Sequence, residues 1–304
     1  MISRRHLIGG SAAAVLLPGL AWGQAGTTRA RLPWSSFKAG PHYGAFRDAI
    51  AQMRRNQDPN DPGSMLFWAN AHQFHCPHGV DHFLAWHRAY LALFERQLQT
   101  LSGISDLALP YWDYYSNPRI PAEFTQGPAA TNPLAHPRRG LNVGAALSLA
   151  PFAAAVTRFP NRERDSFEYE VEDRPHNMVH SLIGRDMVTM QSPRDPIFWL
   201  HHANIDRLWS AWAGAGGGRA MPDAGDSYWS GDFHYGGGLA APKAATRDTH
   251  SAFGYRYQNE TMPILLPTTA PPRPPFKRFD PDFPIRLRPN FFAVGPSTSL
   301  ELGA

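Results

Sequence analysis

Apolar residues recur at helical spacing in several stretches of this chain. The clearest run follows Asp195-Pro196, where a proline at the first helical position and an aspartate before it favour a helix start. The apolar positions then recur every three or four residues: Ile197, Phe198, Leu200, Ile205, Leu208, Trp209 and Trp212. This pattern predicts a mostly buried helix over 195–212, ended by the glycine-rich segment 214–218.

The same periodicity predicts helices over 42–57, 64–72 and 81–101, and a short one over 145–156. A Pro- and Asp-rich turn over 58–63 separates the first two, and Gly103 closes the third. We therefore expect a mainly α-helical fold, an antiparallel helical bundle with long irregular loops and little β-structure.

Histidines inside buried helices call for a chemical reason. His176 and His180 lie four residues apart, the spacing with which one helix face binds one metal ion. His201 and His202 are adjacent on the 195–212 helix and point about 100° apart, so only one of them is expected to complete a three-histidine site. Asp206, four residues after His202, is placed to orient the His202 ring.

A second group of histidines lies upstream: His72, His75, His78, His82 and His87. Two three-histidine sites without bridging thiolates or a set of carboxylates favour a pair of copper ions. Spacing alone pairs His78 with His82 on one helix face, because a nine-residue separation puts His78 and His87 on opposite sides of a helix.

Residues 65 to 212 resemble the tyrosinase family, which includes polyphenol oxidases, catechol oxidases and molluscan haemocyanins. The motifs that carry the resemblance are His78 and His87 with eight residues between them, Phe-x-x-Trp-His-Arg-x-Tyr-Leu ending at Leu91, Phe94-Glu95, Pro110-Tyr111-Trp112-Asp113, His176-Asn177-x-x-His180 and the 195–209 run.

The resemblance implies a type 3 pair of copper ions. His72, His78 and His87 would bind one ion, and His176, His180 and His202 the other. His75 is the rival of His72, because the segment between His72 and His78 is shorter than the family leads us to expect. His82 is then a shell or entrance residue.

The resemblance also implies copper-dependent oxidation of small phenols by O2 to o-quinones, with hydroxylation of monophenols beside oxidation of o-diphenols. A catechol oxidase without monophenol activity is the alternative, and a haemocyanin-like O2 carrier is a third reading. Glu172, four residues before His176, and Asn177, directly after it, are the candidate catalytic residues. In similar enzymes a carboxylate at the position of Glu172 holds a water near the copper pair, and we expect Asn177 to help hold and polarise that water. The alternative is that Asn177 caps a turn and Glu172 is a surface charge.

The chain has one cysteine, Cys76, so no disulfide framework exists. Cys76-Pro77-His78 matches the Cys-x-His pattern that forms a thioether between sulfur and a ring carbon in several members of the family. An inert buried cysteine is the alternative.

Composition narrows the remaining classes. The 304 residues, 43% of them hydrophobic, suit one main domain. The net charge of +4 falls to 4 − 2 = +2 without Arg4 and Arg5. The sequence contains no run of Lys and Arg with interleaved aromatic residues, so we do not expect nucleic-acid binding. A dinuclear zinc hydrolase needs a bridging group and a general base that are not evident, and a copper-storage protein would favour Met and Cys ligands.

The termini differ in character from the rest. Residues 1–25 read as a twin-arginine signal peptide, whose apolar run to Leu20 is shorter than the ~20 residues of a membrane span, so we expect a periplasmic or secreted protein without a stable membrane anchor. Residues 26–260 form the expected copper domain. The family resemblance implies that Tyr255 and Tyr257 close this domain by packing against an N-terminal arginine, Arg29 or Arg31, through a cation–π contact. Residues 261–304 are a Pro/Phe-rich C-terminal arm that either wraps the surface or covers the copper entrance. The sequence names neither the natural phenol nor a copper chaperone.

Overall fold

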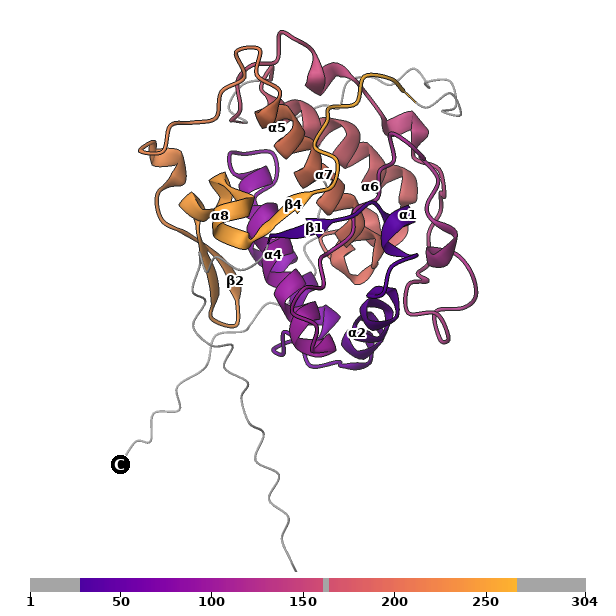
Figure 1. Cartoon of the computed structure of the whole chain (residues 1–304). Helices are drawn as coiled ribbons and strands as arrows, with labels where there is room; N and C mark the ends of the chain where they lie inside the picture. Colours follow the sequence, from indigo (N-terminus) through magenta and orange to yellow (C-terminus); the bar gives the residue numbers. More distant parts are fainter. Residues whose placement is uncertain (1–27, 161–163, 267–304) are drawn as a thin grey trace, which may run out of the picture.

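The computed structural model describes residues 28–160 and 164–266. The proposed signal peptide and residues 267–304 of the proposed arm lie outside the described residues. The described part is mainly helical, with two small two-stranded sheets, and the predicted helical fold is confirmed (Figure 1). No described helix is both long and apolar enough to cross a bilayer.

The centre of the molecule is helix α4 (Phe83–Ser102), which packs against α7 (Ile197–Gly214) and α2 (Tyr43–Arg55). Most side chains of α4 and α7 are buried, as expected of helices that are apolar on nearly every side. Phe94 of α4 stacks on Trp199 of α7 with ring centroids 3.4 Å apart. Gly103 ends α4 at φ 69°, a left-handed conformation that glycine adopts without steric cost.

The four long predicted helices are present, with ends shifted by one to three residues. The helix expected over 64–72 is α3 (Met65–His75), which begins where the Ser64 side chain accepts a hydrogen bond from the Leu66 amide. At the start of α7, Asp195 Oδ1 accepts a hydrogen bond from the Ile197 amide at 3.0 Å. Caps and breakers in the sequence therefore located these helices well.

The helix expected over 145–156 is wrong. The chain there forms two separate 3-10 turns, η2 (Gly144–Ala146) and η3 (Ala150–Phe152). Pro151, which lacks a backbone N–H, sits in the first turn of η3, where it prevents one continuous helix through this segment.

The segment that carries His176 and His180 is not one regular helix. It runs through α5 (Phe167–Val171), the π-helical η4 (Glu172–Asn177) and α6 (Met178–Ile183). Arg174 leaves the helical region at φ −144°, ψ 126°, and the Arg174–Pro175 peptide is cis. The remaining helical elements are short: α1 (Trp34–Phe37), η1 (Ala122–Phe124), η5 (Arg185–Val188), η6 (Ser192–Arg194), η7 (Ser227–Trp229), η8 (Lys243–Arg247) and α8 (Thr249–Phe253).

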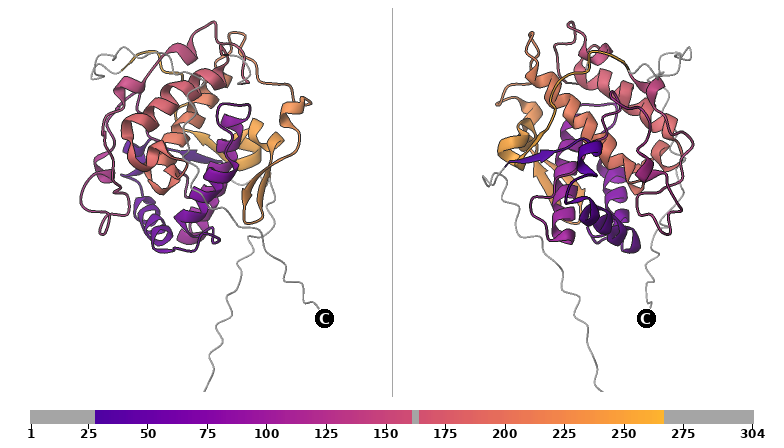
Figure 2. Two further views of the ribbon diagram at one scale, coloured as in Figure 1. Left: turned by 180° about the vertical axis from the view of Figure 1, so that it is seen from behind. Right: turned by 45° about the vertical axis from the view of Figure 1, so that its right-hand side comes forward.

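Two small sheets lie beside this helical core (Figure 2). Strand β1 (Arg29–Arg31) pairs in parallel with β4 (Tyr255–Tyr257), and β2 (Asp232–Gly236) forms an antiparallel hairpin with β3 (Leu239–Pro242). This hairpin lies in a segment for which no helix or strand was predicted. Its turn contains Gly237 at φ 56°, where a Cβ would lie 2.7 Å from the Phe67 ring.

A buried arginine joins the first and last described strands. The Arg31 guanidinium lies 3.5 Å from the centre of the Tyr255 ring, so the expected cation–π contact is confirmed, with Arg31 as its partner. Arg31 also donates from Nε to Glu95 Oε2 of α4 at 2.8 Å. This clasp holds both ends of the described chain against the central helix.

Candidate metal centre

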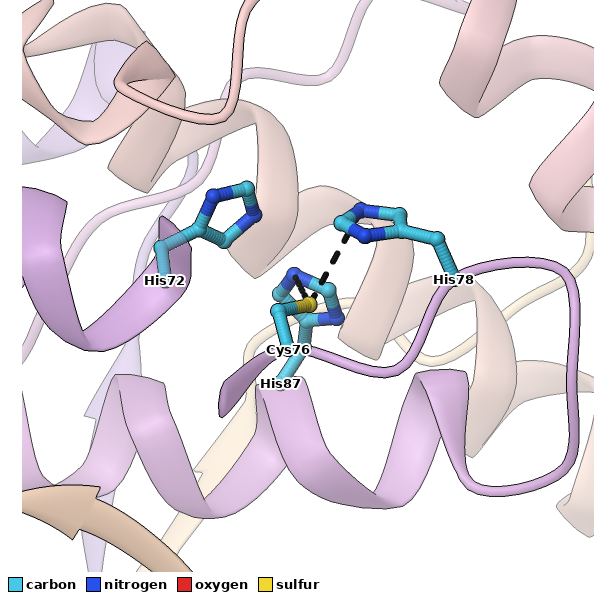
Figure 3. A group of neighbouring side chains, drawn as sticks. All are labelled: His72, Cys76, His78 and His87. Atoms are coloured by element: carbon cyan, nitrogen blue, oxygen red, sulfur yellow. Dashed lines mark hydrogen bonds between the residues drawn. The ribbon is translucent and has the colours of Figure 1, made fainter. Parts of the chain in front are cut away.

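Three elements bring the first group of ligands together. His72 lies in the last turn of α3, Cys76 and His78 in the loop after it, and His87 on α4 (Figure 3). One donor atom from each of the four residues lies within 4.8 Å of the others. The turn between α3 and α4 thus allows His78 and His87 to meet, although nine residues separate them.

Backbone carbonyls orient two of these rings. His72 Nδ1 lies 2.7 Å from the Met190 carbonyl oxygen, and His87 Nδ1 lies 2.8 Å from that of Phe83. Because a carbonyl only accepts, each Nδ1 carries the proton and each Nε2 presents a lone pair. His72 Nε2 is buried and has no hydrogen-bond partner, as expected of an atom that faces a metal ion.

The second group comes from η4, α6 and α7. The Nε2 atoms of His176 and His180 lie 3.3 Å and 3.2 Å from Nε2 of His202. His180 Nδ1 lies 2.6 Å from the Met187 carbonyl oxygen, which again leaves Nε2 with the lone pair. Nitrogen lone pairs that point at one another repel, so this convergence suits a shared cation.

Burial keeps these imidazoles neutral. Burial is the main reason why the pKa values of His78 and His180 fall to about 4. It is also the main reason why the pKa values of His176 and His202 lie well below that of an ordinary histidine. Neutral imidazole is the form that binds a metal ion.

His202 rather than His201 makes the short contacts to the other two nitrogens. His201 belongs to the same cluster of donor atoms, but its ring stacks on that of His176 at 5.4 Å and 13°. The contacts of His202 Nε2 with His176 and His180, at 3.3 Å and 3.2 Å, favour His202 as the third ligand.

The two clusters face each other. The rings of His87 and His202 stack with centroids 4.2 Å apart, and those of His78 and His176 lie 6.1 Å apart. Phe198, fully buried, lies over this junction, 4.1 Å from the His202 ring.

Two upstream histidines fall outside the clusters. His75 is exposed, and its ring lies against the β2–β3 hairpin, so the structure brings His72 rather than His75 to the first cluster. His82 precedes α4 at φ 77°, and its Nε2 donates to the Tyr228 carbonyl at 2.7 Å. Pairing His78 with His82 is thereby ruled out.

The predicted role of Asp206 beside His202 is wrong. Its Oδ1 accepts from Arg88 Nε at 2.5 Å, and its Oδ2 accepts from the hydroxyls of Tyr255 and Tyr257 at 2.6 Å each. His202 Nδ1 has no hydrogen-bond partner among the described residues. The carboxylate turns toward α4 and the arginine clasp because buried arginines compensate its charge there.

The pKa of Asp206 reflects this setting. Burial by itself would raise the pKa, but the charges of Arg88 and Arg31 outweigh that effect and lower it. Asp206 is thus a structural anion of the core.

Glu172 and Asn177 lie near the two clusters, and each makes a contact with a segment that carries a ligand. Glu172, 5% exposed, accepts a hydrogen bond at Oε1 from the Gly79 amide at 2.7 Å. It therefore ties the loop of His78 to the segment of His176. Asn177 Oδ1 lies 3.0 Å from His176 Nδ1, so the amide orients that ring.

Cys76 lies between two rings of its cluster. Its Sγ is 3.8 Å from His78 Nε2 and 3.5 Å from His87 Nε2 (Figure 3). Burial, and secondarily the charge of Glu172, raise the pKa of this thiol well above its ordinary range, so it is protonated. Sequence reasoning missed the proximity to His87, because only the loop geometry creates it.

A helical bundle that holds two facing three-imidazole clusters is a dinuclear copper protein, since imidazole sets of this kind suit copper and the buried nitrogens fit two ions. The family model described as "Common central domain of tyrosinase" matches residues 43–154 and 142–215 of this chain. The chain belongs to the tyrosinase family.

Individual relatives agree. The chain is 35% identical over 188 residues to a tyrosinase of Hahella sp., covering 48% of this chain and 39% of that protein. It is 33% identical over 177 residues to the tyrosinase of Streptomyces glaucescens, covering 44% of this chain and 63% of that one. The match thus spans less than two thirds of these relatives.

Solved structures show the same fold. The polyphenol oxidase of Grenache (Vitis vinifera) matches with a TM-score of 0.66 at 24% identity, covering 79% of this chain and 88% of that chain. A functional unit of octopus hemocyanin matches with a TM-score of 0.57 at 22% identity, covering 76% and 68%. The fold of this chain is therefore similar to that of a polyphenol oxidase and to that of a hemocyanin unit.

Proposed function

We propose that this protein oxidises small phenols with O2 to o-quinones, and that it hydroxylates monophenols as well as oxidising catechols. The observation that carries the proposal is the pair of facing clusters whose ring nitrogens converge. The family match supports a copper oxidoreductase, and the relatives named tyrosinase favour the hydroxylating activity.

The six histidines have defined roles in this proposal. His72, His78 and His87 hold one copper ion, and His176, His180 and His202 hold the other. When bound, the copper ions supply the binding and reduction of O2. Because all six ligands are neutral, the centre keeps a positive charge, which favours a phenolate over a phenol.

The chain must also remove a proton from a monophenol. A phenol has a pKa near 10, so at pH 7 only about one part in a thousand is ionised, and ionisation costs roughly 4 kcal/mol. We assign the acceptor role to a water held by Glu172 and Asn177. Glu172 lies four residues before His176 in the sequence and accepts a hydrogen bond from the Gly79 amide of the His78 loop. Asn177 contacts the His176 ring through Oδ1, and its amide NH2 points away from that atom, which leaves it available to a water.

Phe198 favours the alternative, a catechol oxidase without monophenol activity. Its ring lies 4.1 Å from His202 and 5.2 Å from His72, so it limits the space at the junction of the clusters. A ring that must approach closely to be hydroxylated would be affected more than a catechol that only gives up electrons.

The test is O2 uptake by copper-loaded protein with tyrosine or catechol as the substrate. Uptake with both supports the proposal, and uptake with catechol alone leaves the alternative. Reversible O2 binding without turnover of either would identify an O2 carrier.

We also propose a thioether between Cys76 and His78. The thiol and a ring carbon of His78 each lose a hydrogen as a proton, the S–C bond forms, and the two electrons pass with the two protons to O2, which becomes hydrogen peroxide.

Residues 1–25 would direct export by the twin-arginine route, which places the protein in the periplasm or outside the cell. Fractionation of cells that express Arg4→Lys, Arg5→Lys protein tests this, because the double variant should stay in the cytoplasm.

A further inference from the structure

Three histidines outside the copper clusters line one pocket. His75, His82 and His234 surround a cavity of about 320 Å³, together with Asp232 and other side chains. The cavity lies between the end of α3, the start of α4 and the β2–β3 hairpin. Pro77, from the loop that carries the first-cluster ligands, forms part of its wall.

Two of these side chains share one face of a strand. Along β2, residues alternate between exposed and buried, and Asp232 and His234 are both exposed. His75 approaches the same strand, because its Nε2 lies 3.7 Å from the place where a Cβ on Gly236 would be. Two imidazoles and a carboxylate therefore border the pocket from two different elements.

The His82 ring forms part of the pocket wall but does not offer its Nε2 as a metal ligand. Its Nε2 is already engaged by the Tyr228 carbonyl, and its ring stacks on Tyr228 with centroids 4.1 Å apart. The available nitrogens are those of His75 and His234, which are exposed.

We propose that this pocket binds one transition-metal ion, copper(II) most tightly, through His75, His234 and Asp232. Imidazole and carboxylate donors suit divalent transition metals, and copper(II) is the tightest of the first-row ions at such sites. Among the described residues, three donor atoms lie within 4.8 Å of one another only in the two buried clusters. The exposed side chains must therefore turn inward around the ion, so it binds more weakly and exchanges faster than copper in the buried centre.

The charge of Lys243, which also lines the pocket, would instead favour a small anion. Its Nζ lies 5.4 Å from the Phe233 ring centre, on the same wall. The two occupants make opposite predictions. Asp232→Asn weakens binding of a cation and strengthens binding of an anion, and Lys243→Met does the reverse.

The experiment measures copper bound per chain after the copper-loaded protein is dialysed against a series of copper(II) concentrations. We expect one ion beyond those of the buried centre, with an electron paramagnetic resonance signal split by imidazole nitrogen. His234→Ala and His75→Ala should each abolish this uptake, while His250→Ala, which removes an exposed histidine on α8, should leave it unchanged. His234 is far in sequence from the copper ligands, so its variant remains informative if His75→Ala fails to fold.

Asp232→Asn should weaken the additional copper by roughly two- to fivefold, since it removes one exposed charge. The proposal is overturned if no additional copper binds, if His234→Ala binds as much as the wild type, or if Asp232→Asn binds copper more tightly. The readout is metal content and not turnover, so the result is independent of whether the protein oxidises phenols.

Discussion

His87 of α4 and His202 of α7 stack with ring centroids 4.2 Å apart and only 19° between their planes. They belong to different clusters and lie 115 residues apart in the sequence, yet the packing of α4 on α7 brings them into contact. This contact joins the two clusters into one dinuclear centre.

Adjacent histidines on α7 should differ in their effect on copper. His202→Ala removes the nitrogen that lies 3.2 Å and 3.3 Å from its two neighbours, so the variant should retain one copper ion per chain where the wild type binds two. His201→Ala is the matched control, since it removes the neighbouring ring and should keep both ions. Metal analysis of the purified proteins provides the answer, and copper loss from His201→Ala alone would reverse the assignment.

Cys76 should be linked to a ring in the copper-loaded protein. Intact-mass analysis should show a loss of about two mass units, because the thiol hydrogen and one ring hydrogen leave. Peptide mapping should place the link at His78. A link at His87, whose Nε2 lies nearer to Sγ, would correct the partner, and a thiol that is alkylated after unfolding of active enzyme would remove the idea altogether.

Glu172 and Asn177 should affect hydroxylation more than catechol oxidation. If they hold the water that accepts the phenol proton, Asn177→Ala and Glu172→Gln should lower tyrosine hydroxylation by roughly a hundredfold or more, the usual range for loss of a positioned base. Catechol oxidation should change less. The ratio of the two rates at equal copper content is the measurement.

The contact of Glu172 with Gly79 predicts that two substitutions of Glu172, by glutamine and by alanine, should differ in their effect on copper binding. Glu172→Gln keeps an oxygen acceptor for the Gly79 amide, whereas Glu172→Ala does not, so only the alanine variant should also loosen the His78 loop and lose copper. If Asn177→Ala lowers tyrosine hydroxylation and catechol oxidation equally, this would argue against a water at Asn177 that accepts the phenol proton.

Asp206 should matter for stability and not for copper affinity. Asp206→Ala leaves Arg88 buried without its main counterion, which should lower the free energy of unfolding by about 3–5 kcal/mol. Asp165→Ala, which breaks an exposed pair with Arg158, should cost less than about 1 kcal/mol. Urea unfolding measures both values. If Asp206→Asn instead weakens copper binding tenfold or more, the carboxylate does orient His202.

The pH dependence of this contribution has a definite sign. The folded state lowers the pKa of Asp206, so its stabilisation is fully present above the unfolded value of about 3.9 and is lost as the pH falls through the lower folded value. Unfolding at a series of acidic pH values should therefore show a smaller pH dependence in Asp206→Asn than in the wild type.

The sequence predicts best what local spacing decides. The start of α7 directly after Asp195 and Pro196 and the end of α4 at Gly103 follow from caps and breakers in the sequence. The family resemblance predicted a cation–π contact with Arg29 or Arg31, and the structure confirms it with Arg31 over the Tyr255 ring.

Long-range contacts were harder to predict. Sequence spacing suggested Asp206 as the partner of His202, but a buried carboxylate pairs with the nearest cations, and Arg88 comes from another helix. Every residue has a carbonyl, so nothing in the sequence marks those of Met187 and Met190 as the groups that orient His180 and His72. The apolar period over 145–156 predicted one helix, but Pro151 interrupts that segment and two short turns form instead.

The central claim is that two copper ions lie between the six histidines. The most direct test is a crystal structure of the copper-loaded protein with anomalous scattering recorded at the copper edge. We predict two peaks, one within ligand distance of Nε2 of His72, His78 and His87, the other within ligand distance of Nε2 of His176, His180 and His202. A single peak shared by both clusters, or a peak bound through His75 or His201 in place of His72 or His202, would contradict this account.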